Sequence, residues 1–337
     1  MAVRVAIWGA GKMGHLHGLA YRRIKEVEIV GVIENNDQKA KEFAELFHCM
    51  LFKTINEVPY DLVDAIDICL PTWMHSAAIK KASTLCRGIF CEKPICLNEQ
   101  EFFSIQEVVK KTNCFVMIGQ VLRFWNGYIK AKEILEEGIL GVPRFITCRR
   151  RQKIPEWSAE NWLMNTAQSG GILMDLSIHD VDYVYWILGE PKTVACQVVT
   201  KDDCTLHCQL TLDYEKCCAA LTASWGMPEE FNEGKLEGFL EIVGDKGMLT
   251  YRGDNSLEII TDCGHDNIKL LEEDGYEKEL KYFVDCIQYN KQGNLCDLNS
   301  VEGTMKILWA AEQAARNNEI LPIKAERHDS KKKVGDM

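Results

Sequence analysis

Features of membrane-spanning and secreted proteins are missing from this sequence of 337 residues. No apolar run reaches the roughly 18 residues that a membrane-spanning helix needs. Residues 1–8 enter a strand-like run at once and lack the basic region, apolar stretch and cleavage site of a signal peptide. We therefore expect a cytoplasmic protein.

Positive charge is also scarce. The 39 lysines and arginines are outnumbered by 50 aspartates and glutamates, which gives a net charge of −11 and a pI near 5.3. Nucleic acids and anionic membranes attract proteins with excess positive charge, so neither is an expected partner. One local cluster departs from this balance: Arg149, Arg150, Arg151 and Lys153. We interpret it as the exposed edge of a strand; the alternative is that one of these cations lies near a substrate.

The paired sets of closely spaced ligands that hold a structural zinc ion are absent too, although the chain has 15 cysteines. Several cysteines sit inside apolar runs, where the thiol acts as a small core hydrophobe: Cys69, Cys91 and Cys114. Two clusters stand out, namely Cys204 and Cys208 with His207 between them, and the adjacent Cys217 and Cys218. Neither provides the paired ligand sets of a structural zinc site. We expect reduced thiols and no metal.

The length and the changing pattern of apolar residues predict two domains, residues 1–122 and 123–324, followed by a frayed tail at 325–337. In the first domain short apolar runs alternate with helical patterns, which is typical of a doubly wound parallel sheet. Strands are predicted at 3–8, 28–34, 50–52, 65–70, 88–91 and 114–118, and helices at 13–24, 37–47, 74–86 and after residue 98. Asp37, Thr72 and Asn98 are expected to cap the helices that follow them, Asn98 together with Glu101.

The second domain has the pattern of an α+β fold with a large, open and mainly antiparallel sheet. A helix is predicted at 128–136, a strand at 144–150 and a loop at 154–169, and a continuous helix then runs from the Gly170-Gly171 turn to residue 188. Alternating runs predict five more strands at 193–200, 205–212, 217–224, 236–243 and 248–251. Two helices, at 276–290 and 300–317, close the domain.

A glycine motif lies between the first strand and the first helix. Its residues are Gly9, Ala10, Gly11, Lys12, Met13 and Gly14, in the pattern G-x-G-x-x-G. Gly9 permits a tight turn, Gly11 lets the backbone approach a pyrophosphate, and Gly14 lets the helix pack against the sheet. The start of the helix then offers N–H groups and partial positive charge to the phosphates. With its strand–helix context, the motif predicts a dinucleotide site that includes Lys12 and Met13.

Glu34 lies at the end of the next strand, twenty residues after Gly14. A carboxylate there accepts from both hydroxyls of the adenine ribose and repels a 2′-phosphate. Asn35 and Asn36 follow it, where an NADP enzyme more often has arginine. We therefore expect NAD rather than NADP. The alternative for Glu34 is an exposed carboxylate at a strand end.

Further candidate cofactor residues follow the fourth, fifth and sixth strands, on the crevice side of the sheet: Pro71, Thr72, His75, Glu92, Lys93 and Gln120. Trp73, between Thr72 and His75, is equally compatible with plain packing. The ammonium of Lys93 is placed to hydrogen-bond a reacting oxygen and stabilise negative charge on it. The alternative is a lysine that extends into solvent.

Three motifs in order resemble those of the glucose–fructose oxidoreductase and inositol dehydrogenase family, over about residues 3–322. They are residues 9–14, the Glu92-Lys93-Pro94 triplet and residues 169–182, which read SGGILMDLSIHDVD. The first is generic, whereas the second and third at these separations are specific. The resemblance implies an NAD-dependent dehydrogenase with a cis Lys93–Pro94 bond, and a dimer or tetramer formed through the second-domain sheet.

The third motif places Asp175 and His179 four residues apart, on one face of a helix. Tyr183 is expected to share their side, away from an apolar stripe formed by Ile178, Val181, Val184 or Tyr185, and Leu188. Histidine takes up a proton near neutral pH. The resemblance implies that His179 removes the hydroxyl proton, Lys93 stabilises the developing alkoxide, and Asp175 binds substrate and positions the base.

Several other residues are candidates for substrate binding. Lys93, Asp175 and His179 belong to this set, together with Arg123, Asn161 and Trp162. With Trp157, the last two suggest a wall on which a sugar ring stacks; a small satellite core explains the tryptophans equally well. The expected substrate is a secondary alcohol of a polyol or sugar-like ring, with inositols favoured. Alternatives are a keto-sugar reductase, a nucleotide-sugar dehydrogenase and a dinucleotide-sensing regulator without catalysis.

Overall fold

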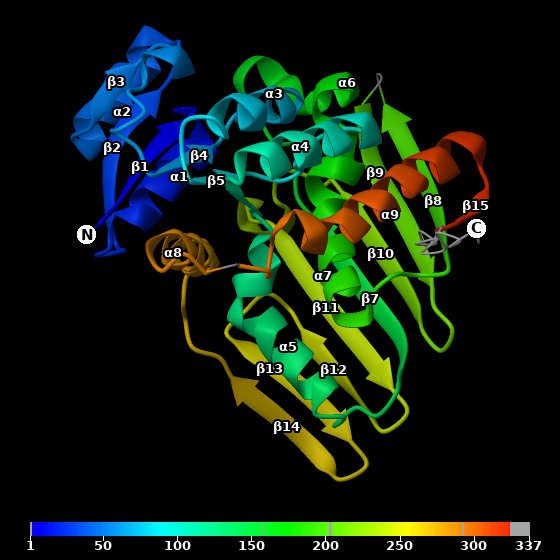
Figure 1. Ribbon diagram of the computed structural model, residues 1–337. Helices are drawn as coiled ribbons and strands as arrows, with labels where there is room; N and C mark the ends of the chain where they lie inside the picture. Colours follow the sequence, from blue (N-terminus) through cyan, green and yellow to red (C-terminus); the bar gives the residue numbers. More distant parts are fainter. Residues whose placement is uncertain (1, 157, 202–203, 292, 324–337) are drawn as a thin grey trace, which may run out of the picture.

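The first domain is built on a six-stranded parallel sheet. A computed structural model describes residues 2–156, 158–201, 204–291 and 293–323 (Figure 1). The sheet has the order β3-β2-β1-β4-β5-β6, with all neighbours parallel. Its strands are β1 (Val3–Trp8), β2 (Val27–Ile33), β3 (Met50–Phe52), β4 (Ala65–Ile68), β5 (Gly88–Cys91) and β6 (Phe115–Ile118). This order confirms the predicted doubly wound sheet.

Helices α1 (Lys12–Tyr21), α2 (Asp37–Phe47), α3 (Thr72–Ala82) and α4 (Glu99–Thr112) connect these strands, with short 3-10 turns η1 (Ile55–Glu57) and η2 (Val121–Phe124). Two expected caps are wrong. Asn36, not Asp37, caps α2, because its side chain accepts from the amide of Lys39. Thr72 is the first residue of α3 and its side chain caps nothing. Asn98 caps α4 as predicted, by accepting from the amide of Glu101.

The second domain contains a nine-stranded sheet in the order β14-β13-β12-β11-β7-β10-β9-β8-β15. Its strands are β7 (Pro143–Arg151), β8 (Thr193–Lys201), β9 (Cys204–Asp213), β10 (Cys218–Ser224), β11 (Glu237–Gly244), β12 (Gly247–Tyr251), β13 (Ser256–Thr261), β14 (Gly264–Lys269) and β15 (Ile320–Pro322). Every neighbouring pair is antiparallel except β7 and β10. The mainly antiparallel open sheet is confirmed, and it has three strands more than predicted.

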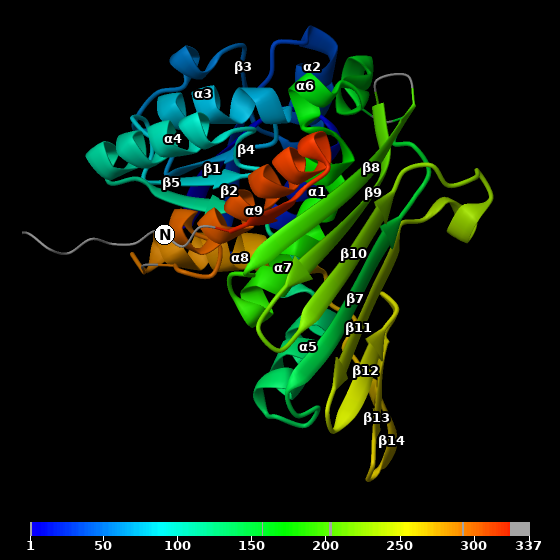
Figure 2. The ribbon, with the colours of Figure 1, turned by 90° about the vertical axis from the view of Figure 1, so that its right-hand side faces the viewer.

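The helices of the second domain cover one face of this sheet (Figure 2). They are α5 (Asn126–Glu136), α7 (Ile178–Leu188) and α9 (Leu298–Asn317), with the short η3 (Ala159–Met164) and α6 (Thr166–Ser169) near one end. The opposite face carries, within the part of the chain that the structure describes, only the excursion around η5 (Phe231–Gly234).

The expectation that the basic cluster forms a strand edge is wrong. Strand β7 lies inside the sheet between β11 and β10. Successive side chains of a strand point to opposite faces, so Arg150 faces the helices, is 4% exposed and pairs with Asp180 at 2.8 Å. Arg149 and Arg151 face the other way and both contact Glu237.

Helix α8 (Gly275–Gln288) returns from the second domain to the first and packs beside α1. Its apolar residues Leu280, Phe283 and Val284 share a core cluster with residues of β1. Arg23, just after α1, adds ion pairs to Asp274 and Glu277 at the start of α8. The boundary at residues 122/123 stays a prediction, and the predicted tail at 325–337 lies outside the described residues. None of the helices among those residues is long and apolar enough to cross a membrane.

Candidate active site

The glycine motif forms a tight loop that leaves space at its centre. Gly9 has a φ of +111°, and a Cβ there would lie 2.7 Å from the carbonyl oxygen of Cys69. A Cβ on Gly14 would lie 2.0 Å from the carbonyl oxygen of Gly9. A Cβ on Gly11, by contrast, would meet nothing within 4 Å, and no side chain caps α1, which begins there. This open helix start fits a pyrophosphate. Lys12 and Met13 lie in its first turn.

Glu34 is held against this loop from the end of β2. Its Oε2 accepts from the amide of Ala10 at 3.0 Å, and its Oε1 accepts from the amide of Asn36 at 2.9 Å. The side chain is half-buried, so it is neither free nor fully extended into solvent. Each carboxylate oxygen keeps a further lone pair, which suits hydroxyl groups of a ribose.

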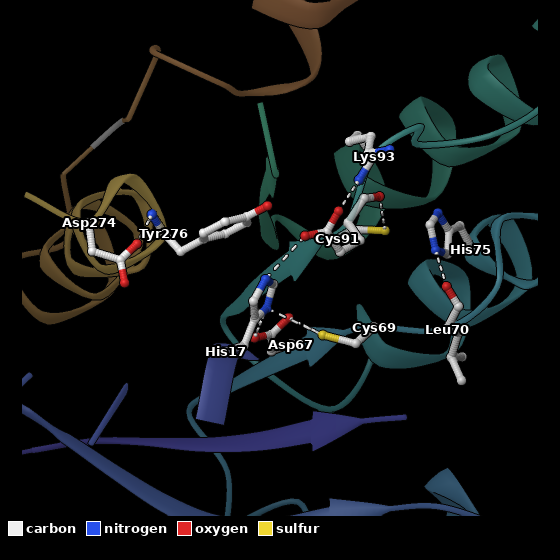
Figure 3. A network of polar contacts seen from close by, with 10 residues as sticks. His17, Asp67, Cys69, Leu70, His75, Cys91, Lys93, Asp274 and Tyr276 are labelled. Carbon is white, nitrogen blue, oxygen red and sulfur yellow. Dashed lines mark hydrogen bonds and ion pairs between the residues drawn. The ribbon is translucent and has the colours of Figure 1, made fainter. Parts of the chain in front are cut away.

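His75 has a structural position at the crevice. The imidazole is 1% exposed, with Nδ1 2.7 Å from the carbonyl oxygen of Pro94 and Nε2 2.7 Å from that of Leu70. It therefore links the segments that follow β4 and β5 (Figure 3). Of its neighbours, Thr72 is buried and Pro71 is half-buried at the start of α3.

Lys93 follows β5 and reaches across to the second domain. The Lys93–Pro94 bond is cis, as the resemblance implied. The Nζ of Lys93 donates to the carbonyl oxygen of Asp175 at 2.6 Å and to its carboxylate Oδ1 at 3.0 Å. Both side chains are mostly buried, at 14% and 16% exposure. An ammonium from one domain and a carboxylate from the other thus meet in a partly closed space.

The helix that carries Asp175 extends over residues 171–188 as predicted, but it is not α-helical throughout. After α6 and the positive φ of Gly170 and Gly171, it contains a π-helical turn at Leu173–Ser177 before α7. Asp175 lies within the π turn, and His179 is the second residue of α7. Single π turns are rare and occur frequently at functional sites.

His179 carries a buried ring nitrogen that lacks a partner. Its Nδ1 has no hydrogen-bond partner among the described residues. Burial, followed by the positive charges of Lys93 and Arg150, holds the pKa of His179 well below its ordinary value. The imidazole is therefore neutral at neutral pH. Tyr183, expected on the same open side, is instead fully buried and donates to the carbonyl oxygen of Tyr128, because α7 is covered on more than one face.

Two candidates at the start of the second domain behave differently. Gln120 is 1% exposed, and neither its amide nitrogen nor its amide oxygen has a partner within the described residues. Such an orphaned amide fits a group that binds there. Arg123 is 3% exposed and bonds Asp182 at 2.7 and 2.8 Å and the carbonyl oxygen of Ser300. Its guanidinium is occupied inside the protein, which does not favour a substrate contact.

The loop candidates Asn161 and Trp162 lie in η3. The ring of Trp162 makes an edge contact with Trp73 of α3, with centroids 5.6 Å apart. Asn161 is exposed and has a positive φ of 53°. The contact joins this loop to the first domain. Trp157 lies outside the described residues.

The suggestive cysteine cluster does not converge on one point. Cys208 faces the helices, where its Sγ lies 2.8 Å from the Oγ of Ser177, whereas His207 bonds Ser224. One other group of ligand-type side chains does come together within the described part of the chain, namely His17, Asp67 and Cys69. These three hydrogen-bond one another. His17 was not among the predicted site residues; its only signal in the sequence is its place one turn after Gly14 in α1.

Comparison with known proteins agrees with this architecture. A family profile described as an oxidoreductase family with an NAD-binding Rossmann fold matches residues 3–120, and one described as the GFO/IDH/MocA C-terminal domain matches residues 128–250. The inositol 2-dehydrogenase of Rhizobium meliloti is 26% identical over 86% of this chain and 89% of that protein. The scyllo-inositol 2-dehydrogenase (NAD(+)) of Bacillus subtilis is 30% identical over 57% of this chain and 55% of that protein.

Solved structures resemble the whole fold. An aldose–aldose oxidoreductase from Caulobacter crescentus superposes with a TM-score of 0.85 at 17% identity, covering 96% of this chain and 100% of that chain. A levoglucosan dehydrogenase in complex with NADH superposes with a TM-score of 0.84 at 18% identity, with the same coverage. Two family profiles, full-length relatives and the glycine loop with Glu34 agree on one conclusion. The chain belongs to the Gfo/Idh/MocA family of NAD-dependent oxidoreductases.

Proposed function

We propose that this protein oxidises a secondary alcohol of a polyol or sugar-like ring with NAD, and that inositols are the favoured substrate class. Lys93, Asp175 and His179 form the proposed catalytic set. One observation carries the proposal: the ammonium of Lys93 is bonded to Asp175 and acts electrostatically on a neutral His179, whose buried Nδ1 has no hydrogen-bond partner among the described residues. A base that is unprotonated at neutral pH is the state that proton abstraction requires.

The roles follow from these positions. NAD, when bound, accepts the hydride from the substrate carbon. His179 takes the proton of the same hydroxyl group, so the alcohol becomes a ketone by loss of one hydride and one proton. Lys93 places a positive charge beside the oxygen and stabilises its developing negative charge. Asp175 fixes the ammonium and offers its second oxygen to a neighbouring substrate hydroxyl.

The dinucleotide is proposed to lie along the edge of the six-stranded sheet. Gly9, Gly11 and Gly14, with Lys12 and Met13, would hold the pyrophosphate, and Glu34 the adenine ribose. Pro71, Thr72, Glu92 and Gln120 would lie beside the rest of the cofactor; His75 would act indirectly, by holding the loops in place. We propose that NAD is preferred to NADP because Glu34 would repel a 2′-phosphate.

Substrate identity rests on the relatives and on the edge of the crevice. Relatives along most of the chain are named inositol 2-dehydrogenases. Trp162, Asn161 and the neighbouring Trp73 provide aromatic faces and an amide, which suit a ring with apolar faces and polar edges. Proteins of similar structure are named as an aldose–aldose oxidoreductase and a levoglucosan dehydrogenase, so a keto-sugar reductase and a nucleotide-sugar dehydrogenase are the alternatives within the enzyme class. The neutral base beside Lys93 favours an enzyme over a sensing regulator.

The assembly is part of the same proposal. We propose a division at residues 122/123, with the second domain serving for substrate binding and for self-association into a dimer or tetramer. The sheet face without helices is the surface for that contact. No nucleic-acid, membrane or metal partner is proposed.

The test is a kinetic screen of purified protein with NAD or NADP and a panel of inositols, polyols and sugars. Reduced-nicotinamide absorbance should rise with NAD and a cyclic polyol. His179→Ala should lower kcat by about 10²–10⁴-fold, and Lys93→Met should lower it as well, with NAD affinity retained. His265→Ala and Lys130→Met are controls, since both residues lie on the surface in other contacts. Turnover that survives both active-site substitutions, or faster turnover with NADP, would contradict the proposal.

A further inference from the structure

A buried histidine, His17, is linked through Glu92 to the proposed catalytic lysine. His17 of α1 is 0% exposed. Its Nδ1 lies 2.8 Å from Oδ2 of Asp67 at the end of β4, and its Nε2 lies 3.1 Å from Oε1 of Glu92, just after β5 (Figure 3). The ring thus lies between two carboxylates, one in β4 and one just after the neighbouring β5, and this pair of contacts is called the clamp.

These contacts define the charge of the ring. An ionised carboxylate can only accept hydrogen bonds, so both nitrogens of His17 must donate, and a ring with both protons is an imidazolium. Burial by itself lowers the pKa of His17, but Asp67 and, after it, Cys69 outweigh burial through charge and hydrogen bonds, and the pKa lies well above its ordinary value. Burial would likewise raise the pKa of Glu92, but the hydrogen bond and charge of His17 hold it below its usual value.

The chain of contacts continues to Lys93. The second oxygen of Glu92, Oε2, accepts from the backbone amide of Lys93 at 3.1 Å. The ammonium of Lys93 then donates to Asp175 in the second domain. A continuous series of hydrogen bonds therefore runs from β4 through His17 and Glu92 to the residue that carries the reacting ammonium.

Other groups face His17 as well. The Sγ of Cys69 lies 3.3 Å from Nδ1, and the rings of Phe90 and Tyr276 are 5.4 Å and 6.2 Å away. Glu279 of α8 is 0% exposed, and neither of its carboxylate oxygens has a partner among the described residues. Burial, then the negative charge of Glu92, raises the pKa of Glu279 well above its usual value, which favours the protonated acid. Tyr21, also buried, stays neutral because burial and Asp67 raise its pKa. His17 is therefore the cation that these groups surround.

We propose that His17 is a positioning residue for catalysis: anchored by Asp67, it holds Glu92, and through Glu92 it fixes the backbone and ammonium of Lys93. This inference rests on the proposed role of Lys93. Stability alone is a weak reason for such a cluster, because apolar residues of similar volume often replace buried ion pairs without loss. Misplacement of a catalytic group by about 1 Å, in contrast, can lower the rate about 10²-fold.

The first arm of the test needs neither cofactor nor substrate. Acetic anhydride labels the lysines of the intact protein, and peptide mass spectrometry measures the labelling rate of Lys93 in wild type, His17→Leu and His17→Gln. Loss of the clamp should free the ammonium from Asp175 and raise its labelling rate severalfold. Asp64→Asn is the matched control: Asp64 also binds two cations, Arg4 and Arg87, but at the opposite end of the same sheet. Unchanged labelling of Lys93 in both folded His17 variants would overturn the proposal.

The second arm measures turnover. The His17 variants should lose about 10–100-fold in kcat, with NAD affinity within a few-fold of wild type. Without the imidazolium the pKa of Glu92 rises, so Glu92 takes up a proton at higher pH. The acid limb of the plot of kcat against pH should therefore shift to higher pH. A defect of folding alone would leave that limb in place. Should His17→Leu fail to fold, His17→Gln and Glu92→Gln test the same contacts with little change of shape.

The two proposals fail in distinguishable ways. Wild-type protein without turnover on any substrate, but with Lys93 labelling that depends on His17, contradicts the proposed function and with it the catalytic part of the inference, whereas the hold of His17 on Lys93 stands. Normal turnover in wild type, with kcat, acid limb and Lys93 labelling all unchanged in the His17 variants, contradicts the positioning inference alone.

Discussion

Among single residues, the protonation of His179 has the most direct consequence for activity. Its pKa lies well below 6.5, first because the ring is buried and second because Lys93 and Arg150 are positive. A base with a lowered pKa stays neutral as the pH falls, and it becomes protonated only below that pKa. The acid limb of kcat/KM that belongs to His179 should therefore lie below pH 6.5.

The pKa of His179 can be measured without turnover. The imidazole carbon-bound proton of His179, assigned by its loss in His179→Ala, should titrate by NMR below its ordinary range. Removal of a nearby cation in Lys93→Met should move the midpoint upward, but only in part, because burial remains. A midpoint at or above the ordinary value would contradict a neutral base.

The glycine motif provides a pair of substitutions with opposite effects. A Cβ on Gly14 would lie 2.0 Å from a backbone oxygen, whereas a Cβ on Gly11 would touch nothing within 4 Å. Gly14→Ala should therefore lower the thermal midpoint of unfolding of the cofactor-free protein. Gly11→Ala should leave that midpoint nearly unchanged and weaken NAD binding, since the added methyl group takes the space meant for the pyrophosphate. Calorimetry of unfolding and of NAD binding measures both, and equal NAD affinity in Gly11→Ala and wild type would argue against this site.

Among the helices and strands, those marked by a local pattern of apolar residues were predictable from the sequence. Strands β1 and β5 coincide with the predicted ranges, because buried parallel strands are continuous apolar runs between turn residues. Strand β3 coincides as well, although only Phe52 of its three apolar residues is buried. Strand β14 was not predicted, because its residues Gly264–Lys269 are polar and mostly exposed and give no apolar alternation. The burial of Arg150 also escaped prediction, since its partner Asp180 is thirty residues away in sequence.

The candidate site was predictable in its residue types but not in its connections. The glycine motif, Lys93 and the pair Asp175 and His179 carry local signals. The π turn at Leu173–Ser177 carries no such signal in the sequence. The clamp on His17 depends on Asp67 and Glu92, fifty and seventy-five residues further along the chain, so only the sheet order brings it together.

Arg123 connects η2 with α7 and α9, and its substitution tests whether it binds substrate. It ties η2 to Asp182 of α7 and to the start of α9 through the carbonyl of Ser300. Arg123→Met leaves a buried carboxylate without its cation, which should cost about 3–5 kcal/mol of unfolding free energy. Arg316→Met, which breaks an exposed pair with Glu312, should cost about 1 kcal/mol or less. Urea unfolding measures both. A folded Arg123→Lys protein with unchanged stability but a raised substrate KM would instead support the substrate-binding prediction.

For the whole molecule, the arrangement of the two domains explains why the site needs both. Lys93 comes from the parallel sheet, whereas Asp175 and His179 come from the segment beneath the nine-stranded sheet. The chain then passes back through α8, which completes the core of the first domain and brings Glu279 to face His17. The position of the ammonium relative to the base therefore depends on the packing of the domains against each other.

The open face of the nine-stranded sheet leads to the last prediction. Phe145 on the central strand β7 is 41% exposed on that face, and Val199 on β8 is 61% exposed. Both side chains lie on the sheet face that α5, α7 and α9 leave uncovered, where a partner could bury them, and the proposed partner is a second copy of the chain. Light scattering after size exclusion should give a multiple of 38.4 kDa for wild type. Phe145→Glu should shift the mass toward one chain, because each copy would bury an unpaired charge. Lys216→Glu, a charge change in the turn between β9 and β10, is the control. A single-chain mass for wild type at micromolar concentration would contradict self-association through this face.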